Sequence, residues 1–258
     1  FLANASYVKN EIKNLGNQTG YIDKESLPTL GTVSRNENGY PIGYFFGYKA
    51  IGVFQTQEEI DSYISPATGK PIQPNAAPGD TKFEDLNGDG VISDDNEDRT
   101  MIGKPNPDWM VGLTVAADWN GFDLSAFFQG SFGADVFDAL RRYELAAVNY
   151  TSDALERWTG PGTSNSMPRI VLGDTPKNFR PSTLLVHDAS FLRLRNLQVG
   201  YTLPAQLTRK AYIQRLRFYA SFDNLLTITG YKGMDPEIGS TMGIDKGVYP
   251  QARVYTFG

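Results

Sequence analysis

Two runs of about ten residues alternate between apolar and polar positions, and they meet at Asn120-Gly121. This dipeptide between alternating runs is the strongest short signal for a two-residue β-hairpin. A two-residue turn fixes the register, so one face of the hairpin is expected to be apolar and the other mostly polar or small. The predicted apolar pairs are Trp119 with Phe122, Ala117 with Leu124, Val115 with Ala126, Leu113 with Phe128, and Val111 with Gly130.

A second pair of strands is predicted from similar alternation in residues 197–202 and 216–223, which residues 203–214 connect. Upstream of this pair, Arg193 and Arg195 share the parity of Leu197 and would interrupt its apolar face. We therefore expect either that this part of the strand lies beyond a hydrocarbon layer or that a β-bulge intervenes. Weaker runs at residues 1–8 and 253–258 bring the number of predicted strands to six.

The connections between these strands are very unequal in length. Two residues join the first hairpin and about a dozen join the second pair, against about a hundred before Trp109 and about sixty between Ser131 and Phe191. If successive strands alternate in direction, the long connections lie at one end and the short ones at the other, as in outer-membrane barrels. Runs of about ten residues also suit tilted membrane strands. A soluble β-sandwich alternates in the same way and stays open as an alternative.

The long connections themselves contain helical patterns. Residues 57–64 predict a short helix, and residues 135–158 show helical periodicity through Val136, Leu140, Leu145 and Val148.

Composition narrows the class of protein without choosing one. The 258 residues are 40% hydrophobic, which suffices for one large β domain or two smaller ones. With 29 acidic and 24 basic residues the net charge is -5, which argues against nucleic-acid binding and against a basic membrane patch. The absence of cysteine excludes disulfides and thiolate sites and fits an oxidising compartment. No apolar run approaches the ~18 residues of a membrane helix, and a start at Phe1 without Met suggests a mature or truncated product.

No residue pattern indicates an enzyme. His187 is the only histidine, and it lies beside Asp188 without a nucleophile motif, so a structural or solvated histidine is expected. Two acid pairs could resemble glycosidase carboxylates. Asp118 and Asp123 flank a tight turn, however, and Asp94 with Asp95 belongs to a metal-like loop described below.

Ten short motifs follow one another along nearly the whole chain. They lie at residues 47–54, 58–60, 78–80, 99–103, 105–107, 188–197, 200–204, 224–226, 231–237 and 249–251, with Tyr-Lys-Gly-Met-Asp-Pro-Glu at 231–237 as an example. In this order they make the chain similar to the C-terminal barrel portion of SusC/RagA-type TonB-dependent outer-membrane transporters. Each motif is weak by itself, but together they are specific.

This resemblance implies an all-β fold, in which residues 1–258 supply the last strands of a large, plugged, antiparallel transmembrane β-barrel of about 22 strands. The long extracellular loops would contain the short helices. Such transporters act in the outer membrane of Bacteroidota-like bacteria and import glycans or oligopeptides with a SusD-like surface lipoprotein. TonB drives them through an N-terminal part and a plug that this chain lacks. The alternative is a secreted, calcium-stabilised β-sandwich that binds glycan or protein.

Residues 85–92 read Asp-Leu-Asn-Gly-Asp-Gly-Val-Ile, the pattern of a calcium-binding loop. Its predicted ligands are the side chains of Asp85, Asn87 and Asp89 and the carbonyl of Val91. Asn96 holds the twelfth position, where an EF-hand has a bidentate glutamate. Either the loop bulges so that Asp98, the acid that the resemblance favours, closes the site, or Asp94 or Asp95 replaces it. The ion would have a structural role and would stabilise the conformation of an outer loop. The competing interpretation is an acidic glycine turn with solvated carboxylates.

Aromatic residues make up 12% of the chain and fall into two groups. Trp119, Phe122 and Tyr201 lie near strand ends on the apolar face, as expected for an interfacial girdle. The long loops hold others that could stack on a substrate, contact a partner lipoprotein or simply pack within the loops. These are Tyr143, Tyr150, Trp158, Tyr231 and Tyr249.

Overall fold

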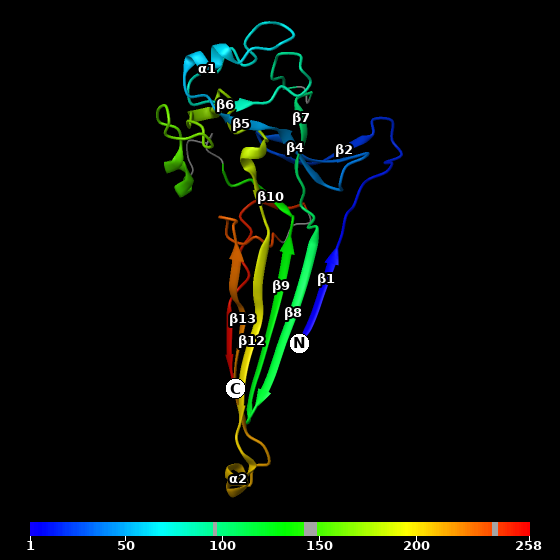
Figure 1. Ribbon diagram of the computed structural model, residues 1–258, viewed down its shortest axis with the longest axis vertical. Helices are drawn as coiled ribbons and strands as arrows, with labels where there is room; N and C mark the ends of the chain where they lie inside the picture. The colour runs from blue at the N-terminus through cyan, green and yellow to red at the C-terminus, as the bar shows by residue number, and fades with distance from the viewer. Residues whose placement is uncertain (95–96, 142–148, 239–241) are drawn as a thin grey trace.

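A six-stranded antiparallel sheet dominates the protein, which we describe from a computed structural model (Figure 1). The structure describes residues 1–94, 97–141, 149–238 and 242–258. The strand order is β1-β8-β9-β12-β13-β15, and this confirms the six predicted strands and the all-β fold class. The bounds are β1 (Leu2–Tyr7), β8 (Trp109–Trp119), β9 (Phe122–Phe132), β12 (Phe191–Thr202), β13 (Arg217–Thr229) and β15 (Val254–Phe257).

The register of the β8–β9 hairpin is the one predicted from the Asn120-Gly121 turn. All five predicted apolar pairs lie opposite one another, from Trp119 with Phe122 to Val111 with Gly130. The turn residues Asn120 and Gly121 both have positive φ, 47° and 84°, which a two-residue turn matching the twist of the strands requires. Each strand has 11 residues, so the expected length is confirmed too.

A β-bulge in β12 resolves the position of the two arginines. The register of β12 against both neighbouring strands shifts between Leu194 and Asn196. Leu194 and Leu197 thereby stay on the apolar face, opposite Phe128 and Ala126 of β9, although they are three residues apart. Arg193 lies opposite Gln129 on the polar face, and the extra residue Arg195 donates a hydrogen bond to Gln129 over 2.7 Å. Of the two alternatives, the bulge is confirmed.

Three smaller sheets form a cap at one end of the long sheet (Figure 1). A core of buried residues lies between these sheets and the adjoining η3 turn (Thr183–Leu185), and it includes Val33, Phe45, Phe137, Leu185 and Ile244. The first has the order β2-β3-β4-β7, the second pairs β5 with β6, and the third has the order β11-β10-β14. Their bounds are β2 (Tyr21–Leu27), β3 (Gly31–Glu37), β4 (Tyr44–Tyr48), β7 (Arg99–Gly103), β5 (Ala50–Val53), β6 (Thr81–Phe83), β11 (Val186–Asp188), β10 (Asp135–Asp138) and β14 (Ile244–Asp245).

The helices are short, and only one of the two helical predictions is correct. Helix α1 (Gln57–Ser62) confirms the first and is capped by Thr56, which accepts a hydrogen bond from the Glu59 N–H. At residues 135–138 the helical prediction is wrong, because Val136 and its neighbours form strand β10, which pairs with β11 on one side and β14 on the other. Leu140 lies just beyond β10 and is not helical. Leu145 and Val148 fall outside the described residues.

The remaining helical turns are η1 (Ser152–Glu156), η2 (Leu172–Asp174), η3 (Thr183–Leu185), α2 (Ala205–Thr208) and η4 (Arg209–Ala211). In the described part of the chain, no helix combines the length and the apolar character needed to cross a membrane. The short connections lie at the end of the sheet marked by α2, and the cap lies at the other end (Figure 1). The predicted separation of short and long connections is therefore confirmed.

Candidate functional site

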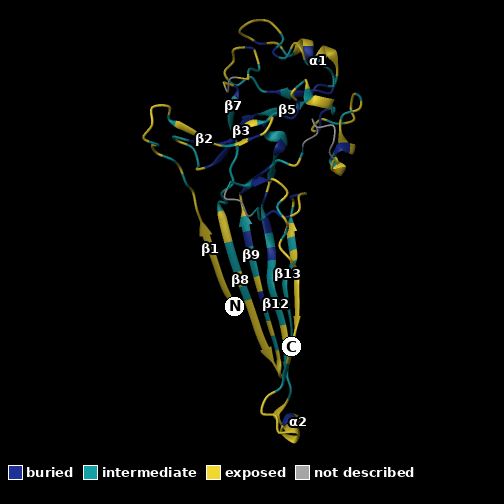
Figure 2. Cartoon of the chain, turned by 180° about the vertical axis from the view of Figure 1, so that it is seen from behind, coloured by how far each residue is buried: buried dark blue, intermediate teal, exposed yellow. Residues whose placement is uncertain are grey.

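One face of the long sheet is apolar and open. Large side chains that share this face by register are solvent-exposed, among them Trp119, Phe122, Phe218 and Ile228, and Trp119 reaches 75%. The other sheets of the described residues lie in the cap, so none of them covers this face (Figures 1 and 2). A β-sandwich would bury such a face against a second sheet. An apolar surface of this extent marks an interaction with protein or membrane.

Aromatic side chains form a row across the apolar face near the α2 end. Trp119 is paired with Phe122, Phe122 with Tyr201, and Tyr201 with Phe218, so the row crosses four strands. The Phe122 and Tyr201 rings are 4.4 Å apart between centroids. The sequence predicted the first three members. Phe218 was missed, although its parity in β13 could have identified it.

A second aromatic row lies near the cap. Tyr7 is paired with Trp109, with ring centroids 5.0 Å apart, and Trp109 is paired with Phe132. Ten residues separate Trp109 from Trp119, or about 34 Å at about 3.4 Å per residue. A strand tilted by about 45° would span about 24 Å of that along the membrane normal, close to the apolar band of about 25 Å in outer-membrane barrels.

The opposite face of the sheet carries polar and charged groups that bind one another. Near the α2 end, Arg217 contacts Asp123 over 2.5 Å. Farther along, Asn196 donates a hydrogen bond to Asp223 over 2.7 Å. Asp118 lies opposite Asp123, but the ion pair with Arg217 engages Asp123, so the two acids do not form the isolated pair that a glycosidase would use.

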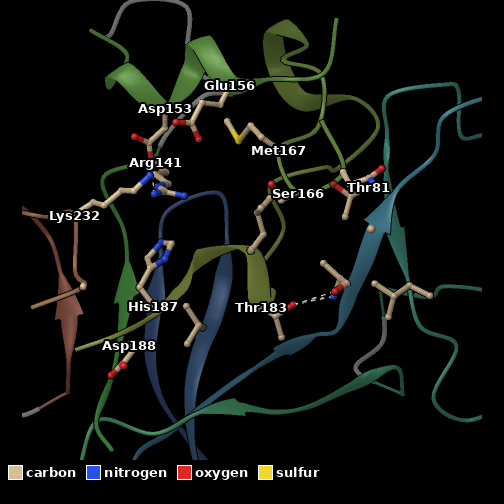
Figure 3. Close-up of a pocket in the computed structure, with 17 residues that line it drawn as sticks. Thr81, Arg141, Asp153, Glu156, Ser166, Met167, Thr183, His187, Asp188 and Lys232 are labelled. Atoms are coloured by element: carbon tan, nitrogen blue, oxygen red, sulfur yellow. Dashed lines mark hydrogen bonds and ion pairs between the residues drawn. The ribbon is translucent and has the colours of Figure 1, made fainter. Parts of the chain in front are cut away.

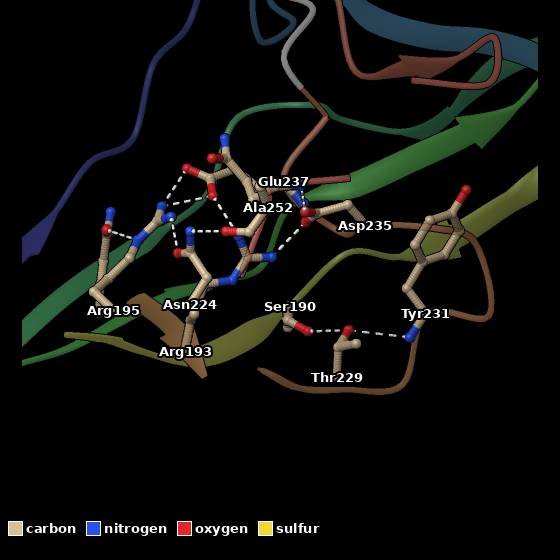
Figure 4. A network of polar contacts seen from close by, with 11 residues as sticks. Ser190, Arg193, Arg195, Asn224, Thr229, Tyr231, Asp235, Glu237 and Ala252 are labelled. Carbon is tan, nitrogen blue, oxygen red and sulfur yellow. Dashed lines mark hydrogen bonds and ion pairs between the residues drawn. The ribbon is translucent and has the colours of Figure 1, made fainter. Parts of the chain in front are cut away.

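Near the cap, two arginines of the bulge bind two acids of a distant loop (Figure 4). Arg193, only 2% exposed, contacts Asp235 over 2.5 Å and Glu237 over 3.1 Å. Arg195 contacts Glu237 over 2.5 Å and Asn224 over 3.2 Å. The bulge places both guanidinium groups on the same face, where they hold the segment after β13 against the polar face of the sheet.

Asp235 also holds both ends of that segment. Its carboxylate accepts backbone N–H groups from Glu237 over 2.9 Å and from Gln251 over 3.0 Å. Burial opposes the charged form, but the hydrogen bonds from Gln251, Arg193 and Glu237 outweigh it and hold the pKa of Asp235 below its ordinary value. The carboxylate is therefore ionised at neutral pH and stabilises the inward fold of this segment.

A cavity of about 630 Å³ lies within the cap, between the β5–β6 pair, η1 and residues 183–188 (Figure 3). Charged side chains of both signs line it: Arg141, Asp153, Glu156, Asp188 and Lys232. His187 also lines it, with Nε2 3.8 Å from the carboxylate of Asp138. Burial, together with the nearby Arg141 guanidinium, lowers the pKa of His187, so the imidazole is neutral at neutral pH. This volume is in the range of small-ligand sites.

The Asp98 side chain lies inside the calcium-like loop. This carboxylate is fully buried and accepts the N–H groups of Leu86 over 3.1 Å and Ser93 over 3.0 Å. Asp94 instead turns outward and pairs with Lys177. Of the acids considered from the sequence, Asp98 is thus placed inside the loop and Asp94 outside it. Asp95 and Asn96 fall outside the described residues.

The other predicted ligands organise the loop backbone. Asp85 accepts the N–H groups of Gly88 and Gly90 over 2.8 and 2.9 Å, and Asp89 accepts that of Val91 over 2.8 Å. Asn87 donates to Asp89 and Glu97, each over 3.0 Å. Among the described residues, no three acidic or histidine side chains converge as a ready-made metal site. Calcium binding therefore stays a prediction.

The loop aromatics divide between packing and exposure. Tyr231 is buried and donates a hydrogen bond to Asp245 over 2.6 Å, and Trp158 donates one to Gln55 over 3.1 Å, so both support the cap. Tyr249 is 88% exposed and Tyr150 is also exposed. Tyr143 lies outside the described residues.

Comparisons with known proteins agree with this architecture, although no family model matches the chain. TonB-dependent receptor P3 of Formosa agariphila is 34% identical over 231 residues, which cover 85% of this chain and 22% of that protein. TonB-dependent receptor SusC of Bacteroides thetaiotaomicron is 30% identical over 258 residues, covering 99% and 23%. The solved RagAB peptide transporter superposes with a TM-score of 0.73 at 27% identity, covering 99% and 26%.

The chain thus spans about a quarter of the length of the proteins it matches. Those proteins are receptors and transporters, not enzymes, in agreement with the prediction from the sequence. Sequence identity over most of the chain and a common strand arrangement lead to one conclusion. The chain belongs to the SusC/RagA family of TonB-dependent receptors.

Proposed function

We propose that the chain forms part of the wall and mouth of a TonB-dependent importer in the bacterial outer membrane. The observation that carries this proposal is the long sheet with an exposed apolar face between two aromatic rows and a polar opposite face. The apolar face would contact lipid, and the polar face would line the lumen. The cap would lie outside the cell, and the Asn120-Gly121 turn and α2 would lie in the periplasm.

The substrate would be a glycan or an oligopeptide, held jointly with a SusD-like surface lipoprotein. Two observations support this: a relative is named SusC, and similar solved structures include RagAB peptide importers. The cap cavity lies in the proposed mouth and offers side chains of both signs to a passing substrate. TonB would act on a part of the importer outside these residues.

Cysteine labelling in the full-length receptor tests the placement of the sheet, because these 258 residues contain no cysteine and any cysteine elsewhere in the receptor is first replaced by serine. Val115→Cys on the apolar face should react with a lipid-soluble maleimide, and Thr114→Cys on the polar face with a water-soluble one. Leu155→Cys on η1 in the cap, where the native side chain is 80% exposed, should react with an impermeant reagent on intact cells. Equal labelling of positions 114 and 115 by the water-soluble reagent would exclude a lipid-facing wall.

Uptake assays test the transport step. Cells that lack the receptor gene should lose uptake of a labelled oligopeptide mixture or of a labelled oligosaccharide, and the intact gene should restore it. Unchanged uptake of both substrate classes would contradict the proposed function.

We also propose that the loop at residues 85–98 binds a structural Ca²⁺ through Asp85, Asn87, Asp89, the Val91 carbonyl and Asp98. The support is the order of oxygen donors along the loop and the placement of Asp98 within it. Calcium should slow proteolysis of the loop in the wild type and in an Asp61→Asn control, whose side chain is exposed on α1. Asp89→Asn should remove the effect, and a wild-type loop indifferent to calcium would exclude the site.

A further inference from the structure

The connection between β12 and β13 concentrates positive charge at the α2 end of the sheet. Residues 189–222 contain no acidic residue, in a chain whose net charge is -5. Within this stretch Arg209, Lys210 and Arg215 are all exposed, and no ion pair of the described residues involves them. Although the net charge of the chain is negative, Arg209, Lys210 and Arg215 thus give this connection a local basic surface.

The same connection exposes large apolar side chains. Tyr212 is 98% exposed, and Leu207 and Ile213 are exposed as well. The turn is nevertheless folded: Thr208 is buried, the Tyr212 N–H bonds to Arg209 over 3.1 Å, and the Ile213 N–H bonds to Thr208 over 3.1 Å. Basic and apolar groups are thus presented together on a compact turn, the composition typical of interfacial membrane segments.

This turn lies at the same end of the sheet as the aromatic row near α2, and this position indicates the kind of molecule that it contacts. Thr202 and Leu203 leave β12 beside the hairpin turn, where the Thr202 N–H bonds to Gly121 over 2.7 Å. The row that includes Trp119 and Phe122 lies on the same end of the sheet and would mark the edge of the hydrocarbon. A headgroup layer is only roughly 5 to 8 Å thick on each side, so residues 203–216 begin within that layer.

From these observations we infer that residues 203–216 form a docking surface for anionic phospholipid headgroups, with Tyr212 and Leu207 inserted beside the acyl chains and Arg209, Lys210 and Arg215 contacting phosphates. The occupant follows from charge complementarity and from continuity with the aromatic row. The inference rests on the proposed function, since it needs the sheet in a membrane. It adds a lipid contact that would fix the depth of the barrel at its short-turn end.

Spin labelling of the full-length receptor in lipid nanodiscs tests the inference. A nitroxide on Tyr212→Cys should show the oxygen and nickel-chelate accessibility of the boundary between headgroups and acyl chains, and it should lie deeper in discs with phosphatidylglycerol than in pure phosphatidylcholine. Each basic residue near such a surface contributes about 1 kcal/mol, or about fivefold in preference for anionic lipid. The R209Q/K210Q/R215Q variant should therefore lose the dependence on headgroup charge.

Two controls separate this inference from the proposed function. The K9Q/K24Q/K70Q variant removes three exposed lysines in segments on the cap side of the sheet and should keep the dependence on headgroup charge. A label on Val115→Cys should report hydrocarbon in every disc. If that label reports hydrocarbon but the Tyr212 label is aqueous or insensitive to charge, the lipid surface is wrong and the barrel wall stands. If the Val115 label is aqueous, both proposals fail.

Discussion

Replacing Arg193 with methionine tests whether the arginine pair of the β12 bulge holds the segment after β13 in place. Removal of one partner from a buried ion pair costs about 3 to 5 kcal/mol, because the other charge stays buried without its counterion. The cost for Arg193→Met should lie at the lower limit of this range, because Asp235 keeps its two backbone donors and Glu237 keeps its 2.5 Å contact with Arg195. We therefore expect about 3 kcal/mol, or about a hundredfold faster local opening.

Amide hydrogen exchange of the full-length receptor in detergent measures this opening. The informative amides are those of Glu237 and Gln251, which both donate to Asp235. The matched control is Arg217→Met, which breaks the ion pair with Asp123 at the other end of the same face. Both partners of that pair are about a quarter exposed, so the loss should be under about 1 kcal/mol and should not reach residues 235–251.

An Arg193→Met variant whose Glu237 and Gln251 amides exchange within threefold of the wild type would refute the reasoning. So would an equal effect of Arg217→Met. The pH dependence gives a further check: because the pKa of Asp235 is lowered in the fold, its stabilisation is present above the ordinary carboxyl pKa near 4 and is lost only as the pH falls through the lowered value. The free energy of opening should therefore stay constant from pH 5 to 8.

Three further predictions concern the cap and the hairpin. The pKa of His187 is lowered by burial and by a neighbouring guanidinium. Because the unfolded chain then takes up a proton more readily than the folded cap, cap stability should decline as the pH falls below about 6.5. Thermal unfolding of the His187→Gln variant should lack this decline. Gly121→Ala should reduce the amount of folded receptor, because φ is +84° and a Cβ would lie 2.7 Å from a β12 carbonyl oxygen. The control Gly31→Ala, at φ +71° with no atom near the added Cβ, should cost only about 1 kcal/mol of stability. A folded yield equal for both alanine variants would contradict this. Asp98→Ala should speed proteolysis of the calcium-like loop, because the part-buried N–H groups of Leu86 and Ser93 lose their acceptor at a cost of about 2 kcal/mol. Asp94→Ala, on the surface, should not have this effect.

The sequence alone determined the six strands of the long sheet and the register of one hairpin. The apolar face follows from alternation, and the β8–β9 register follows from the two-residue turn, as the Trp119–Phe122 to Val111–Gly130 ladder shows. The bulge was foreseeable for the same reason, since Arg193 and Arg195 break an otherwise regular parity. These signals are local: once a turn fixes the first pair, every later pair in the ladder follows.

Only the tertiary structure decided what the arginines bind and how the cap is built. Asp235 and Glu237 lie more than forty residues from their partners, and no periodicity connects them. Val136 has helical spacing, yet it lies in a strand because β11 and β14 flank it on both sides. Contacts of this kind depend on which distant segments the folded chain brings together, and a local pattern carries no record of that choice.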